Sequence, residues 1–132
     1  MAAREIFNPY RTPGLDMKQH YGMHQSMGVK AGGFIFFSGM YALDPSTGER
    51  LHGTVTSETR IILENLQSML AHAGLSLDRL VQIHALIYDR IEYDVLNRIY
   101  RQFMPNPPPA RTVWSVQLDA GFKIQIDAVA AA

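Results

Sequence analysis

Residues 80–88, Leu-Val-Gln-Ile-His-Ala-Leu-Ile-Tyr, decide the fold of this chain, because this apolar run lies between two stretches with helical patterns. Asp78 and Asp89 bound the run. Its short length and its branched side chains favour a buried strand over a third helix. We therefore expect a central strand here, with a helix before it and a helix after it.

The two flanking stretches have the period of amphipathic helices. Apolar residues recur at three- and four-residue spacing through residues 62–73, with polar residues between them. Thr56 or Ser57 is suited to cap the start of this helix, and Gly74 to end it. Residues 93–103 repeat the pattern and end shortly before a proline. The sequence thus predicts two helices, each with one apolar face.

Further strands are predicted on both sides of this helical region. Residues 34–37, Phe-Ile-Phe-Phe, are almost wholly apolar and read as a strand buried on both faces. Residues 112–118 and 122–128 alternate regularly and predict a hairpin joined near residues 119–121. Together these elements predict an α+β fold, in which one mixed sheet carries both helices on one face.

The predicted sheet has a second apolar face that no helix of this chain covers. In so small a domain, copies of the same chain are the simplest cover, so we expect a homo-oligomer. Residues 1–22 contain several turn residues and little periodicity, which predicts an irregular N-terminal arm. Residues 23–132 then form a single domain.

Arg111 follows a proline-rich connector, residues 105–110, Pro-Asn-Pro-Pro-Pro-Ala. Prolines and the residues before them have few backbone states, so the direction in which Arg111 enters its strand is largely fixed. A planar and permanently charged guanidinium suits a carboxylate ligand. The alternative is an ordinary solvated arginine after a loop, because proline-rich connectors are common.

Composition excludes several classes of function. The 132 residues include no cysteine, so thiol nucleophiles, disulfides and cysteine-ligated metals are ruled out. Twelve basic and 12 acidic residues leave a formal net charge of zero, which argues against a nucleic-acid partner. No stretch approaches the roughly 20 apolar residues of a membrane span, and the N-terminus lacks a signal core. We therefore expect a cytoplasmic protein with neither a membrane nor a nucleic acid as partner.

Several short pieces of this chain resemble one known family, and their order and spacing are more specific than any single piece. The pieces are Gly32–Gly39, Ala42–Glu49, Leu63–Leu66, Ala73–Leu77, Asn97–Tyr100 and Pro109–Thr112. From about Val29 to the C-terminus, the chain resembles the RidA/YjgF/L-PSP family.

This resemblance implies a chorismate-mutase-like fold, a homotrimer and ligand sites in clefts between subunits. It also implies hydrolysis of reactive enamines and imines of small amino acids to 2-oxo acids and ammonia, without a metal or organic cofactor. Arg111 matches the arginine that holds the substrate carboxylate. Ser38 matches a pocket serine, and Gly39 matches the residue beside it.

Three positions depart from the family pattern. Gln125 stands where deaminating members usually carry a glutamate, and glutamine can orient water but cannot exchange a proton. Residues 25–27, Gln-Ser-Met, replace a run that usually begins with tyrosine, and Met40 replaces a common glutamine. The resemblance therefore predicts the existence of the pocket more firmly than the identity of the substrate.

Two functions of different class remain open from the sequence. The first is an imine or enamine hydrolase in which Arg111 anchors a small carboxylate-bearing substrate, while Ser38 and Gln125 orient water. The second is a non-catalytic trimer that binds a small carboxylate or a protein. Gln125 separates them, because a missing acid–base group favours the second. A ribonuclease function is disfavoured by the zero net charge.

Overall fold

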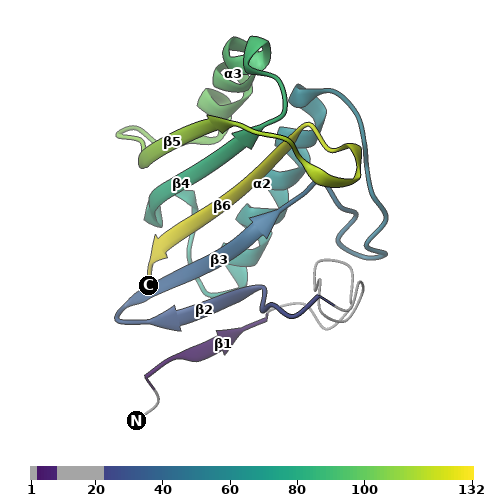
Figure 1. The fold of residues 1–132 in the computed structure, drawn as a ribbon. Coiled ribbons are helices and arrows are strands. Elements are labelled where there is room, and N and C mark those ends of the chain that lie inside the picture. The colour runs from purple at the N-terminus through teal and green to yellow at the C-terminus, as the bar shows by residue number, and fades with distance from the viewer. Residues whose placement is uncertain (1–2, 9–22) are drawn as a thin grey trace.

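The computed structural model describes residues 3–8 and 23–132, which form a six-stranded mixed sheet in the order β1-β2-β3-β6-β4-β5. Figure 1 shows helices α2 and α3 on the same side of this sheet. The α+β, chorismate-mutase-like class expected from the sequence is confirmed. The elements are β1 (Glu5–Phe7), β2 (Gly28–Ala31), β3 (Phe34–Met40), α2 (Val55–His72), β4 (Leu80–Ile87), α3 (Tyr93–Phe103), β5 (Ala110–Ser115) and β6 (Ile124–Ala131).

Strand β4 lies inside the sheet, as residues 80–88 predict. It pairs in parallel with β5 and antiparallel with β6. Ile83, Ala85 and Ile87 alternate along it and are fully or almost fully buried beneath the helices. The apolar run forms a strand because both of its edges are paired and one of its faces lies in the core.

The hairpin predicted from residues 112–118 and 122–128 is wrong. Strands β5 and β6 do not pair, because β4 lies between them in the sheet. The chain crosses from one side of β4 to the other through residues 116–123, which include a 3-10 turn at Asp119–Gly121. Alternation reports the face to which a side chain points, but it does not report which strand lies alongside.

Residues 34–37 are buried on one face only, which corrects the expectation of a strand buried on both. Ile35 and Phe37 point into the core, whereas Phe34 and Phe36 are 39% and 47% exposed. The helices cover one side of the sheet, so the other side of β3 stays open in a single chain. We call that side the open face.

The expected irregular arm at residues 1–22 is corrected in part. Glu5–Phe7 forms the edge strand β1, which pairs antiparallel with β2, and the Phe7 ring packs edge-on against Phe37 with 5.9 Å between ring centroids. A three-residue strand is too short to show a period. Residues 9–22 lie outside the described part of the chain.

Helix α2 begins at Val55, and its N-cap is Thr54 rather than the expected Thr56 or Ser57. The side chain of Ser57 completes a reciprocal capping box with Thr54. Gly74 follows the helix with a φ of 73°, as its predicted role requires. In the first turn, the buried carboxylate of Glu58 accepts hydrogen bonds from the backbone N–H groups of Gly53 and Lys123. This contact fixes the chain immediately before β6.

Candidate functional site

Arg111 lies on the edge strand β5 and points to the helix side of the sheet. It is in register with the buried Ile83 of β4, and its guanidinium carbon is 4.7 Å from the ring centroid of Tyr100 and 5.8 Å from that of Tyr93. A guanidinium nitrogen also donates a long hydrogen bond, 3.4 Å, to the Tyr93 hydroxyl. Among the described residues no carboxylate forms an ion pair with Arg111.

The ring of Tyr100 packs directly against this guanidinium. Its side chain is 7% exposed, and its buried hydroxyl has no hydrogen-bond partner among the described residues. Burial raises the pKa of Tyr100, and the charge of Arg111 opposes that rise. The sequence identified Tyr93 and Tyr100 only as part of an apolar helix face. Their spacing of seven residues, two helical turns, placed them on one side of α3 but did not reveal the arginine above them.

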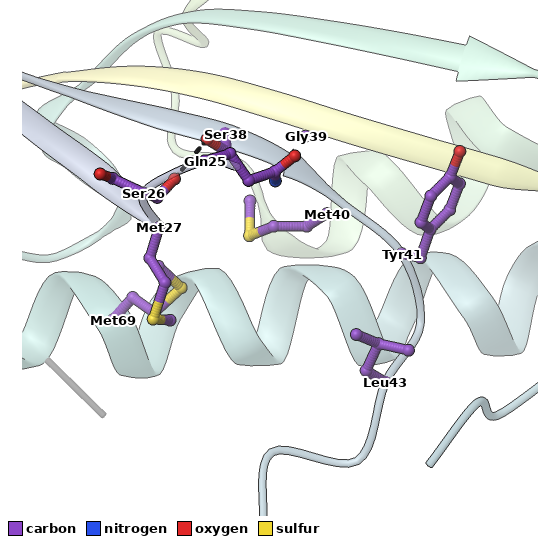
Figure 2. A pocket seen from close by; sticks show the side chains of 9 residues that line it. All are labelled: Gln25, Ser26, Met27, Ser38, Gly39, Met40, Tyr41, Leu43 and Met69. Atoms are coloured by element: carbon purple, nitrogen blue, oxygen red, sulfur yellow. Dashed lines mark hydrogen bonds between the residues drawn. The ribbon is translucent and has the colours of Figure 1, made fainter. Parts of the chain in front are cut away.

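Ser38 lies on β3, near a register shift between this strand and β6. Its hydroxyl donates a 2.6 Å hydrogen bond to the carbonyl of Ser26, and its backbone N–H donates to the carbonyl of Met27. Figure 2 shows this bond and the Met27 side chain beside Met69 of helix α2. These contacts tie the segment before β2 to β3.

Gly39 leaves the space that the side chain of Gln125 occupies. A Cβ atom at residue 39 would lie 2.5 Å from Nε2 of Gln125, so no side chain fits there unless Gln125 moves. Gln125 alternates along β6 with the fully buried Ile124 and Ile126, which places it on the open face. Gly39 and Gln125 therefore lie next to each other on the open face.

Two pockets have Ser38 in their lining. The first, drawn in Figure 2, has an interior of about 20 Å³, little more than one water molecule needs. Its lining residues are Gln25, Ser26, Met27, Ser38, Gly39, Met40, Tyr41, Leu43 and Met69. The second is an open groove of about 440 Å³, in which Arg4 and His24 join Ser38. The sequence did not assign Arg4 or His24 to this site, because both lie in segments without periodicity.

The structure brings together only some of the predicted site residues. Ser38, Gly39 and Gln125 share one region, whereas Arg111 on β5 lies three strands from β3 and two strands from β6, about 14 Å and about 10 Å across the sheet at the usual strand spacing. Arg111 also points to the helix side, and Gln125 points to the open face. One chain therefore carries two separated half-sites, an arginine half and a serine half.

The described part of the chain contains no helix long and apolar enough to cross a membrane. Among the same residues, no group of three or more His, Asp or Glu side chains is arranged to hold a metal ion. The side chains predicted for the site carry a guanidinium at Arg111, a hydroxyl at Ser38 and a carboxamide at Gln125.

The fold defines a class of small α+β proteins with one mixed sheet and two helices on one face, and here an arginine without a described carboxylate partner lies on the edge strand β5. A family model described as Endoribonuclease L-PSP matches residues 19–132, and the chain belongs to this family, also called RidA/YjgF/L-PSP.

Relatives of known name extend this result. A RutC family protein of Pyrococcus horikoshii is 33% identical over 106 residues, covering 80% of this chain and 84% of the relative. The 2-iminobutanoate/2-iminopropanoate deaminase of Mus musculus is 32% identical, covering 80% of this chain and 78% of the relative. The crystal structure of E. coli TdcF with bound serine superposes with a TM-score of 0.80 at 28% identity, covering 97% and 98% of the two chains.

Proposed function

We propose that this protein hydrolyses reactive imines and enamines of small amino acids to 2-oxo acids and ammonia. The observation that carries the proposal is Arg111, a half-buried guanidinium held over the Tyr100 ring without a carboxylate partner among the described residues. A substrate carboxylate supplies that partner. The name of the mouse relative supports the same chemistry.

The reaction asks little of the protein beyond positioning. Water adds to the carbon of the C=N bond, and the resulting carbinolamine expels ammonia as its C–O bond becomes a carbonyl. Arg111 holds the carboxylate so that the imine carbon meets water in a fixed orientation. The Ser38 hydroxyl already donates a hydrogen bond to the Ser26 carbonyl, so its oxygen can serve a ligand only as an acceptor. Gln125 offers both an acceptor and a donor to the attacking water.

A complete site requires both half-sites, and a second copy of the chain can supply the missing one. The open face carries exposed Phe34, Phe36 and Trp114, which favours burial against another copy. We therefore include a homotrimer in the proposal, with the arginine half of one chain facing the serine half of the next. Light scattering that finds a stable monomer at micromolar concentration would contradict this arrangement.

The test of activity uses freshly generated 2-iminopropanoate and its longer homologues. Release of 2-oxo acid and ammonia should be faster with the protein than in buffer, and Arg111→Ala should abolish the difference. If no 2-imino acid is hydrolysed faster, the enzyme proposal fails. The alternative is then a non-catalytic trimer that binds small carboxylates, which Gln125 favours because a carboxamide exchanges no proton.

A further inference from the structure

The open groove beside Ser38 extends over the first three strands of the sheet. Figure 1 shows β1, β2 and β3 side by side at one edge. The groove volume of about 440 Å³ lies within the range of small-molecule sites. Besides Ser38, its lining residues are Arg4, Ile6, His24, Gln25, Ser26 and Val29. The groove therefore leaves room beside Ser38 for the side chain of a substrate.

This groove lies on the open face of the sheet. Ile6, Val29 and Phe36 are in register across β1, β2 and β3, and Phe36 is exposed on the open face. Arg4 precedes β1 and Ser38 lies on β3, so these two lining residues come from opposite sides of β2. Strands β1 and β3 are about 10 Å apart at the usual strand spacing. A ligand that reaches from Ser38 to Arg4 therefore has to cross β2.

The charge-bearing side chains of the groove are both basic. Arg4 and His24 line it, and none of the described residues that line it is acidic. Among the described residues, no carboxylate forms an ion pair with either of them. The next acidic residue in the sequence, Glu5, alternates to the other face of the sheet and is in register with Lys30. In a chain with zero net charge, a groove with basic groups alone favours an anionic group.

We propose that this groove selects substrates with a second carboxylate, so that imines of dicarboxylic amino acids such as glutamate are preferred to imines with apolar side chains. The inference rests on the proposed function. Arg111 of a neighbouring copy holds the α-carboxylate near Ser38, and the substrate side chain extends along the groove. Arg4 and His24 then bind the terminal carboxylate. A guanidinium forms two parallel hydrogen bonds to a carboxylate, and an imidazole has at least one N–H donor in either protonation state.

Calorimetric titration of the whole protein with two 2-oxo acids tests the inference without requiring turnover. 2-Oxoglutarate and 2-oxopentanoate have the same five carbons, but only the first has a second carboxylate. The wild type should bind 2-oxoglutarate at least about tenfold more tightly, the gain expected from one charge-assisted contact. Arg4→Gln should remove most of this preference and His24→Gln a smaller part. Neither variant should change the affinity for 2-oxopentanoate.

The matched control is Lys30→Gln, which removes a positive charge close in space to the groove but outside it. Lys30 follows Val29 on β2, and its ammonium lies over the Phe7 ring, 5.1 Å from the centroid, on the helix side of the sheet. The preference for 2-oxoglutarate should persist in this variant. If Lys30→Gln lowers the preference as much as Arg4→Gln, the overall charge attracts the dianion, and the inference is overturned. Equal affinities for both oxo acids in wild type, or an unchanged preference in Arg4→Gln, would overturn it as well.

The ratio of the two affinities separates this inference from the proposed function. Arg111→Ala should weaken both oxo acids by a similar factor and leave their ratio unchanged, because both share the α-carboxylate. If the ratio is about one while 2-iminopropanoate is hydrolysed, the inference fails and the proposed function stands. If neither oxo acid binds, the inference fails, and the hydrolysis assay still decides the proposed function. If the preference is found without hydrolysis, the groove binds dicarboxylates and the enzyme proposal fails.

Discussion

The two half-sites of this chain are built in different ways. In the arginine half, a side chain is held by other side chains: the Arg111 guanidinium lies over the Tyr100 ring and contacts Tyr93. In the serine half, backbone geometry is decisive, because Ser38 bonds the Ser26 carbonyl and Gln125 fills the space above Gly39. The arginine half should therefore be sensitive to substitutions that change the functional group, and the serine half to substitutions that change side-chain volume.

This difference suggests that the arginine half provides affinity for the substrate and the serine half positions the attacking water. In the proposed function, the charged fork of Arg111, which has no ion-pair partner among the described residues, provides binding free energy for a carboxylate. A hydroxyl and a carboxamide held at fixed places provide orientation for water. The following predictions are arranged by expected effect, and each would weaken or sharpen this comparison.

The largest effect is expected at Arg111. Arg111→Lys should impair binding of small 2-oxo acids almost as much as Arg111→Ala, about ten- to a hundredfold, because a point ammonium cannot form a bidentate fork. Ligand-induced shifts in melting temperature measure this loss. Equal shifts in wild type and both variants would show that Arg111 is not the anchor.

Gly39→Ala should be the next most damaging change, because the new methyl group meets the carboxamide of Gln125. We expect a loss of about 1–3 kcal/mol of stability from overpacking, together with slower turnover. The matched test is a double-mutant cycle in urea with Gln125→Ala, which removes the obstructing atoms. If Gly39→Ala costs the same in both backgrounds, the two residues do not compete for one space.

Gln125→Glu should change the rate of imine hydrolysis only modestly. We expect a gain well below the roughly hundredfold that a positioned acid–base group typically contributes, because imine hydrolysis needs little proton transfer from the protein. The variant should instead lose activity as the pH falls through the titration range of a carboxyl group, near pH 4–5. A rate–pH profile of both proteins checks this. A large gain at neutral pH would mean that the wild type lacks a needed proton-transfer group.

The smallest effect is expected for Tyr100→Phe, which keeps the ring beneath Arg111 and removes a hydroxyl that has no hydrogen-bond partner among the described residues. Because burial raises the pKa of Tyr100 above its ordinary 10.0, this group stabilises the fold below pH 10, and the contribution falls as the pH rises beyond it. Tyr100→Phe should therefore lose less stability than wild type between pH 8 and pH 11. Urea unfolding across this range provides the measurement, and identical losses would contradict it.

Much of the fold could be predicted from local pattern. The strand at residues 80–88 and the helices on either side have clear periods, and burial of one face follows from them. The N-cap is Thr54, two residues before Thr56 and three before Ser57. All three side chains are suited to capping, so the local sequence does not single out one of them. The hairpin was wrong, because alternation within β5 and β6 carries no information about β4 lying between them.

The candidate site was predictable in its residues but not in its geometry. Arg111, Ser38, Gly39 and Gln125 could be named from motif resemblance. Their division into two half-sites could not, since strand order and the face of each side chain are long-range properties.

The sequence by itself determined the class of fold, the family and the residue types available for chemistry, because these depend on local period, composition and short motifs. Only the tertiary structure decided which strand pairs with which, why Gly39 has no room for a side chain, and that Arg111 lies on Tyr100. Those outcomes depend on contacts between residues far apart in the chain, and the packing of the whole domain selects among them.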